Sequence, residues 1–130
     1  MSRIKSQEIE SVVNLVGAER YSYFIKKVAD SEKLWSLKNK DGWVLASDSD
    51  GKQVVPVWSH IEYAKLCMND EWRDCSPEVI NLREWMDRWI PGMIKDKKKV
   101  GVFPTIVSKG VVVDPERLHN DLNDELSKIE

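Results

Sequence analysis

Two Asp-Gly pairs in the stretch from Asp41 to Tyr63 constrain the fold of this chain more than any other feature. Asp41-Gly42 and Asp50-Gly51 each stand between short runs of apolar, β-prone residues. Asp-Gly supplies the positive φ angles that tight hairpin turns need, so each pair predicts a reversal between two antiparallel strands. We therefore expect a three-strand meander in this part of the chain.

Strand-like patterns extend on both sides of these turns. Trp35 and Leu37 alternate with Ser36 and Lys38, as in a strand with one buried face. After the second turn, Pro56 lacks a backbone donor, which predicts that its strand lies at a sheet edge or carries a bulge. Further strands are expected near 79–82, 100–103 and 111–113. The last two are apolar on nearly every residue, as is typical of central strands covered on both faces.

Helical spacing of apolar residues predicts helices at roughly 6–16, 18–30, 60–68, 81–93 and 115–129. Residues with known positional preferences mark several of their ends. Ser6 is expected to cap the first helix and Gly17 to end it. Ser59 and Glu62 have the spacing of a capping box. Pro91 is expected to kink or divide the fourth helix, because proline removes a backbone bond and clashes with the preceding turn.

The length of 130 residues is that of one ordinary domain, so we expect residues 1–130 to form a single unit. The alternation of helical and strand patterns predicts the α+β class. The expected sheet is mainly antiparallel, with about five to six strands, and packs against N-terminal helices, a kinked helix and a C-terminal helix.

Composition predicts a cytoplasmic protein with no membrane contact. No apolar run approaches the roughly 20 residues of a membrane helix, and the charged N-terminal segment does not resemble an export signal. Cys67 and Cys75 are therefore expected to be free thiols. A net charge of −2 argues against direct nucleic-acid binding, which usually requires a basic excess.

No motif predicts catalysis. His60 and Glu62 have the H-x-E form of zinc deaminases, but the closely paired cysteines that those enzymes require do not follow. A structural zinc held by His60, Cys67, Cys75 and His119 is conceivable, although these spacings match no familiar zinc motif.

Two further ligand motifs have simpler explanations. The segment 48–51 resembles the first half of a calcium loop, yet it lacks the later glutamate ligand and suits a hairpin turn better. The lysines at 95 and 97–99 could contact phosphates, but no aromatic residue lies among them to stack on bases. We therefore expect no cofactor and no metal.

Acidic residues gather around one tryptophan in the loop 69–76. Asp70, Glu71 and Asp74 surround Trp72 there. An exposed tryptophan ringed by carboxylates has the make-up of a protein-binding hot spot, in which the ring is buried by the partner and the charges select it. The alternative is that Trp72 folds back onto the core and the loop is only solvated.

The tip of the second hairpin carries further negative charge. We therefore predict a partner-binding surface made of Asp48, Asp50, Asp70, Glu71, Trp72 and Asp74.

Several short motifs resemble a known family. These are Tyr23-Phe24, Asp41-Gly42-Trp43, Pro56-Val57-Trp58 followed by His60, Glu62 and Tyr63, and Val102-Phe103-Pro104. Together they resemble the bacterial family named domain of unknown function 2750, over about Glu19 to Glu125. The resemblance implies a small cytoplasmic α+β protein and implies no catalytic residues.

Small domains of this kind recur as immunity proteins, which block toxins encoded beside them. We therefore expect a non-enzymatic immunity protein that binds a basic toxin domain, such as a nuclease, as a monomer or small homo-oligomer. One alternative is a housekeeping regulator or adaptor that binds another cellular protein. Another is a small hydrolase or ligand-binding protein with His60, Glu62 and Tyr63 in a pocket.

Overall fold

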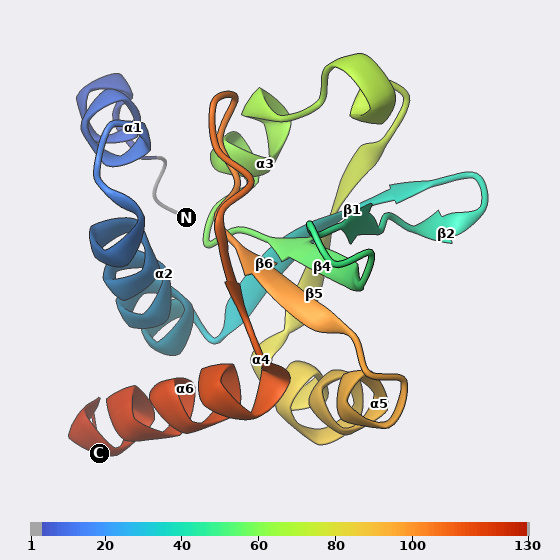
Figure 1. The fold of residues 1–130 in the computed structure, drawn as a ribbon. Helices are drawn as coiled ribbons and strands as arrows, with labels where there is room; N and C mark the ends of the chain where they lie inside the picture. The colour runs from blue at the N-terminus through green and yellow to red at the C-terminus, as the bar shows by residue number, and fades with distance from the viewer. Residues whose placement is uncertain (1–3, 130) are drawn as a thin grey trace.

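The computed structural model describes residues 4–129 of the chain. Its helices are α1 (Ser6–Val13), α2 (Gly17–Ser31), α3 (Ile61–Leu66), α4 (Leu82–Glu84), α5 (Ile90–Lys95) and α6 (Pro115–Ile129), with a 3-10 turn η1 (Asp70–Trp72) and a π-helical turn η2 (Trp85–Trp89). Its strands are β1 (Lys33–Asn39), β2 (Gly42–Trp43), β3 (Ala46–Ser47), β4 (Gln53–Val57), β5 (Ser76–Asn81), β6 (Lys99–Val102) and β7 (Val111–Val113). Figure 1 shows their arrangement.

The strands form two sheets that meet at a pair of tryptophans. One sheet has the order β2-β1-β5 and the other the order β3-β4-β6-β7. The Trp35 amide donates to the Trp58 carbonyl at 2.8 Å, and the Trp58 amide donates back at 2.9 Å, which joins β1 to the end of β4. Every strand pairing is antiparallel except that of β4 with β6. The predicted α+β class with a mainly antiparallel arrangement is confirmed.

The expected single meander is wrong, because its strands divide between the two sheets. β2 pairs with β1, whereas β3 pairs with β4 in the other sheet. Val44 and Leu45 lie between β2 and β3, and the Val44 side chain is buried in the core. The Val44 amide still donates to the Leu37 carbonyl of β1 at 3.0 Å, so the chain leaves the first sheet between Val44 and β3.

Both Asp-Gly pairs do lie at hairpins. In the first, Gly42 pairs with Asn39, so Lys40 and Asp41 occupy the tip, and the glycine has a φ of 123°. In the second, Gly51 has a φ of 79°. Residues other than glycine rarely adopt such φ angles, which is the physical reason for glycine at both turns.

Two expectations about strand positions are corrected. Pro56 lies on β4, an inner strand rather than an edge. It is tolerated there because β3 pairs only with Gln53 and Val54, so that no neighbouring strand needs a donor from Pro56 on that side. β6 is an inner, buried strand as expected, but β7 is an edge strand whose Val112 side chain is exposed.

The expected helix-end signals at Ser6, Gly17 and Ser59 are not observed. Ser6 is the first residue of α1 and caps nothing, whereas Gly17 begins α2 instead of ending α1. The capping box at Ser59 is also wrong. The Ser59 hydroxyl lies 2.9 Å from Nδ1 of His60, and His60 itself precedes α3 without a side-chain cap.

At Pro91, where the sequence predicts a kinked or divided helix, the segment is divided into α4, the π-helical turn η2 from Trp85 to Trp89, and α5, which begins just before the proline. A wider turn accommodates the missing amide donor and the ring of Pro91, so that the helix continues past it. The Asn81 side chain caps the start of this segment by accepting from the amides of Arg83 and Glu84.

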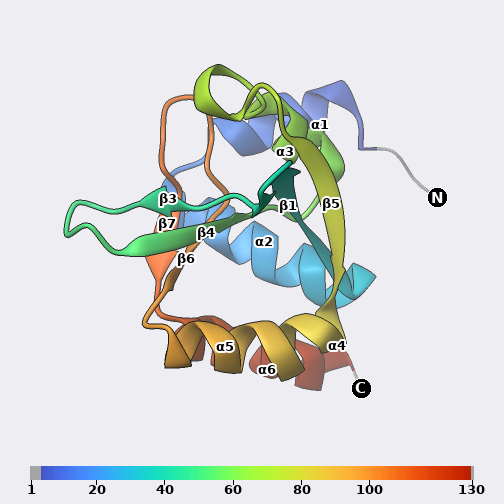
Figure 2. The ribbon, with the colours of Figure 1, turned by 90° about the vertical axis from the view of Figure 1, so that its right-hand side faces the viewer.

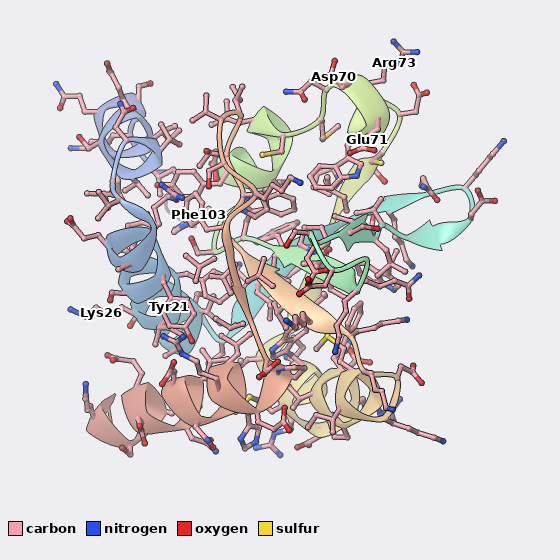
Figure 3. All side chains as sticks on the ribbon, in the orientation of Figure 1. Tyr21, Lys26, Asp70, Glu71, Arg73 and Phe103 are labelled. Carbon is pink, nitrogen blue, oxygen red and sulfur yellow. The ribbon has the colours of Figure 1, made fainter. Side chains whose placement is uncertain are left out.

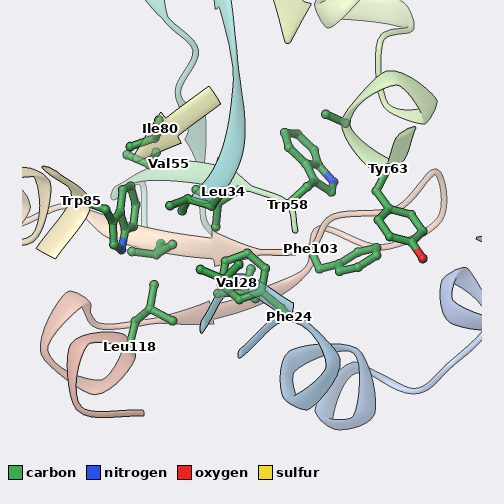
Figure 4. Packing of buried hydrophobic residues seen from close by; sticks show 14 of the residues in the cluster. Phe24, Val28, Leu34, Val55, Trp58, Tyr63, Ile80, Trp85, Phe103 and Leu118 are labelled. Atoms are coloured by element: carbon green, nitrogen blue, oxygen red, sulfur yellow. The ribbon is translucent and has the colours of Figure 1, made fainter. Parts of the chain in front are cut away.

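The core lies between the sheets and the helices. α2 and α6 pack against each other, and α5 and α6 lie together along one end of the sheets (Figure 2). Figure 4 shows Phe24 and Val28 of α2 packed beside Leu34, Trp58 and Phe103. No helix within residues 4–129 is both long and apolar enough to span a membrane.

Candidate functional site

One face of the four-stranded sheet forms the floor of a groove of about 960 Å³. Alternate residues of a strand point to opposite faces, and here Val55, Val57, Val100, Val102 and Val113 face the core. The residues between them line the groove: Ala46, Val54, Pro56, Lys99, Gly101 and Val112. The helices therefore cover one face of this sheet, and the groove lies over the other, where Val54, Pro56 and Gly101 are themselves buried at its floor.

Gly101 lies on this floor, between Pro56 of β4 and Val112 of β7. A Cβ atom at Gly101 would lie 2.8 Å from Cγ1 of Val54, closer than side chains pack. The glycine therefore keeps the floor flat at this position.

Three segments rise around the floor. They are the β3–β4 hairpin at 47–50, the η1 residues Glu71 and Trp72, and the loop 104–109. In Figure 3, Asp70 and Arg73 point away from the sheets at the outer end of η1, and Glu71 lies nearer the sheets. The groove is thus bounded by segments that are far apart in the sequence.

The walls of the groove are rich in exposed apolar side chains. Among the described residues, the large hydrophobic side chains with strong exposure are Val16, Leu45, Leu66, Val79, Ile94, Ile106, Val107 and Val112. Half of them line this groove: Leu45 (40% exposed), Ile106 (72%), Val107 (92%) and Val112 (38%). Exposed apolar side chains scattered singly are normal on a protein surface, but a contiguous set marks an interaction site.

Ile106 and Val107 occupy the tip of a tight turn. The Thr105 amide donates to the Ser108 carbonyl at 2.9 Å, and the Ser108 amide donates back to the Thr105 carbonyl at 3.3 Å. The two residues at the tip of a tight turn are usually Gly, Asn or Asp, because these residues tolerate positive φ angles and are compatible with exposure to water. Formation of the turn therefore does not explain why its tip is apolar.

The structure brings four of the six predicted partner-binding residues to this groove: Asp48, Asp50, Glu71 and Trp72. Asp70 and Asp74 are exposed but do not line it. Asp50 and Glu71 are also exposed, and neither forms an ion pair with a described residue. These two carboxylates are the free negative charges of the groove.

Asp48 has a different role from the one expected. Its Oδ1 accepts hydrogen bonds from the amides of Lys52 at 2.8 Å and Asp50 at 2.9 Å, and its Oδ2 lies 3.7 Å from Nζ of Lys99. The two amides and the lysine charge hold the pKa of Asp48 below its ordinary value. The carboxylate shapes the hairpin tip and is already neutralised by Lys99.

Trp72 is half-buried, and its ring lies edge-on against the buried ring of Trp58, with centroids 6.1 Å apart. The alternative in which Trp72 folds back onto the core is thus the one observed. Trp72 nevertheless lines the groove and is only partly buried.

The predicted surface did not include Leu45, Ile106, Val107 and Val112, because the prediction was based on negative charge around an aromatic residue. One signal could have revealed part of the site. Ile106-Val107 is an apolar pair between Pro104-Thr105 and Ser108-Lys109-Gly110, where a polar turn would be expected.

A comparison with models of protein families identifies the family of this chain. The family model described as "Protein of unknown function (DUF2750)" matches residues 21–122. The chain belongs to this family. The match contains both sheets and the whole groove, begins within α2, and leaves α1 outside. No curated protein matches the chain.

The resemblance to DUF2750 is confirmed, and several residues that carry it meet beside α1. The Tyr23 hydroxyl donates to Oε2 of Glu8 at 2.6 Å and lies 2.9 Å from the Tyr63 hydroxyl. The Tyr63 ring packs against Phe103, with centroids 4.6 Å apart, and edge-on against His60 at 5.5 Å. This cluster links α1, α2, α3 and the end of β6.

This DUF2750 cluster includes His60 and Tyr63, which the alternative small-hydrolase reading placed in a pocket. Burial lowers the pKa of His60 and raises that of Tyr63 to about 12. Tyr63 therefore remains protonated at neutral pH. Its hydroxyl is engaged with Tyr23, and neither His60 nor Tyr63 lines one of the grooves described here.

The cysteines lie in the core as free thiols, and burial raises the pKa of Cys67 to about 11. Within residues 4–129, no three His, Cys, Asp or Glu side chains come close enough to hold a metal ion. The structure therefore does not assemble His60, Cys67, Cys75 and His119 as zinc ligands.

A second groove, of about 560 Å³, lies between α2 and α6, but most of its charged groups bond to one another. The Tyr21 hydroxyl donates to Asp121, whose carboxylate also lies 3.7 Å from Nε of Arg117. Lys128 lies 3.5 Å from Glu125. Few groups are left free to recognise a ligand there.

Proposed function

We propose that this protein acts without catalysis by binding another protein in the groove over the four-stranded sheet, and that the partner is a toxin domain which it neutralises. The observation that carries the proposal is the gathering of Leu45, Ile106, Val107 and Val112 in one groove beside Trp72. A contiguous set of exposed apolar side chains marks an interaction site, and tryptophan is one of the residue types enriched in interface hot spots.

Burial of these side chains by a partner would favour association. Complete burial of one Leu, Ile or Val contributes about 1.5–3 kcal/mol. Ile106 and Val107 are exposed by 72% and 92% in the free protein, so most of their apolar area is still in contact with water. A partner that covers this groove gains most of that contribution.

The free charges of the groove favour a basic partner. Asp50 and Glu71 lie at the rim without ion-pair partners among the described residues, whereas the Lys99 charge is compensated by Asp48. Lys109 is the positive charge that remains on the groove. Rim carboxylates of this kind accelerate association with a basic surface and disfavour acidic partners.

Toxin neutralisation is the concrete form of this proposal. A nuclease toxin has a basic substrate cleft, and a protein that presents apolar anchors beside free carboxylates can occupy such a cleft. The proposal places the protein in the cytoplasm, where a toxin must be blocked to protect the cell that makes it.

The test uses the full chain and the product of the adjacent reading frame. We expect that frame to encode a toxin domain, that growth is arrested when it is expressed alone, and that co-expression of this chain restores growth. Calorimetry with the purified domain should show complex formation. An adjacent product that is not toxic, or a toxin that does not bind the chain, would contradict neutralisation.

A pair of matched variants tests whether the groove is the binding surface. Leu45 in the groove and Ile94 on α5 are exposed to nearly the same extent, 40% and 42%. Leu45→Asp should weaken the complex about tenfold or more because it places a charge among the apolar anchors, whereas Ile94→Asp should not. Equal affinities for the two variants would show that the partner binds elsewhere.

A further inference from the structure

The turn from Thr105 to Ser108 is supported from its base. The Pro104 carbonyl, which precedes the turn, accepts a hydrogen bond of 2.9 Å from the indole of Trp58. The Phe103 amide donates to the Val57 carbonyl at 2.8 Å. The chain thus leaves the sheet at a position fixed by buried donors and acceptors.

Gly110 fixes the chain after the turn. Its φ is 85°, and a Cβ atom at this residue would lie 2.6 Å from the Val102 carbonyl oxygen and 2.9 Å from the Pro104 nitrogen. The two ends of the loop therefore approach so closely that only glycine fits between them. The Gly110 amide also donates to the Ser108 hydroxyl at 3.1 Å.

Arg20 supports the turn from α2. Its side chain is buried, with 6% of the residue exposed, and its guanidinium donates to the Leu15 carbonyl and, at 3.3 Å, to the Ser108 hydroxyl. Its Nε has no hydrogen-bond partner, and no described carboxylate forms an ion pair with it. Burial of an unpaired guanidinium is costly, so stability alone does not explain an arginine at this position.

We propose that the Thr105–Ser108 turn is a docking element that inserts Ile106 and Val107 into an apolar cleft of the partner, and that Arg20 holds the turn in its binding conformation. This inference rests on the proposed function and specifies which wall of the groove makes the central contact. Rigid apolar side chains bind more tightly than mobile ones because less conformational entropy is lost on association.

The charges near the turn favour a protein over a lipid surface as the partner. Asp50 and Glu71 line the same groove without ion-pair partners among the described residues, and Asp70 lies on the same 3-10 turn as Glu71. An anionic membrane would be repelled by these carboxylates, whereas a protein cleft with apolar walls and basic residues at its rim complements both the turn and its neighbours.

The first experiment identifies what the turn contacts. A photoreactive phenylalanine analogue replaces Val107 in the full chain, or Val79 on β5 as the control, since Val79 is 51% exposed and lies outside the groove. We expect irradiation of the cells that make the protein to link a single partner protein to position 107 and none to position 79. The linked residue of the partner should be apolar and lie in a cleft flanked by Lys or Arg.

Three results of this experiment would overturn the inference. They are the absence of a linked protein at position 107, equal linking from both positions, and linking to lipid. Flotation with vesicles of phosphatidylcholine and phosphatidylserine checks the last result, and binding lost in Val107→Asp would indicate a membrane element.

The second experiment tests Arg20 as a positioning residue. Arg20→Met keeps an apolar side chain in place of the buried stem but removes the bond to Ser108. We expect amide exchange at Thr105 and Ser108 to become about tenfold faster, with affinity for the linked protein falling and exchange in β5 unchanged. Arg20→Lys restores a donor and should restore part of the affinity.

The outcomes separate this inference from the proposed function. If Leu45→Asp weakens binding while Ile106→Asp and Val107→Asp do not, the groove binds the partner and the turn is not its docking element. If none of the three variants weakens binding, the groove is not the binding surface and the proposed function is contradicted. Unchanged exchange at Thr105 and Ser108 in Arg20→Met would contradict the role of Arg20 alone.

Discussion

The indole N–H of Trp58 donates a hydrogen bond of 2.9 Å to the carbonyl oxygen of Pro104, and the ring of Trp58 lies edge-on against that of Trp72. One buried side chain therefore supports two walls of the groove, the loop 104–109 and the 3-10 turn at Asp70–Trp72. The hydrophobic core and the candidate binding surface are coupled at this residue.

Trp58→Phe should lower the free energy of unfolding by about 2 kcal/mol, because it removes both the hydrogen bond to Pro104 and part of a fully buried side chain. Chemical denaturation measures the change. Trp89→Phe is the control, since Trp89 is only half-buried and forms no hydrogen bond through its indole within the described residues. A loss no greater in Trp58→Phe than in the control would contradict the role of this bond.

Thiol chemistry should report the burial of Cys67. Burial raises its pKa to about 11, so that little thiolate exists at neutral pH, and the thiol itself is covered. We expect an aromatic disulfide reagent to react with neither Cys67 nor Cys75 in the folded protein at pH 7.5, and with both in urea. Rapid labelling of Cys67 under native conditions would show that its surroundings open readily.

Acidification should destabilise the protein partly through His60. Burial lowers its pKa in the folded state, so the unfolded chain binds a proton more readily. The contribution of neutral His60 to stability is complete above its ordinary pKa of about 6.5 and is lost as the pH falls from there toward the folded-state pKa.

Urea unfolding of His60→Asn at pH 7.5 and pH 5.5 tests this sign. The difference in unfolding free energy between the two pH values should be smaller than in the original protein. His119→Asn, at the other histidine, is made for comparison. An undiminished difference in His60→Asn would contradict the role of His60.

The hairpin at the groove rim should depend on Asp48 more than on Asp50. Asp48 accepts two amide hydrogen bonds, whereas the Asp50 carboxylate is free. Asp48→Ala should therefore speed amide exchange at Asp50 and Lys52. Asp50→Lys should leave exchange there unchanged but weaken the binding of a basic partner. Loss of hairpin protection in both variants would contradict this division of roles.

Much of this fold could be predicted from local patterns. Apolar spacing identified α2 and α6, and the Asp-Gly pairs identified both hairpins. The division into two sheets was not predictable in this way. It depends on the parallel pairing of β4 with β6, which is a contact between segments far apart in the sequence.

The site was predicted only in part for a similar reason. Charge around Trp72 and at the second hairpin is visible in the sequence, and four of those residues meet in the groove. The sequence does not show that Asp48 is neutralised by Lys99, or that Leu45 and Val112 are exposed at the same groove. Those facts depend on which face of the sheet the helices leave uncovered.

Amide hydrogen exchange of the free protein and of its complex maps the bound surface without altering a residue. We predict slower exchange in the complex at 45–50, 71–72 and 104–109, the segments that form the groove. Exchange on β5 and on the α2 and α6 faces of the second groove should not change. Protection confined to β5 or to the second groove, with the first unaffected, would contradict the account.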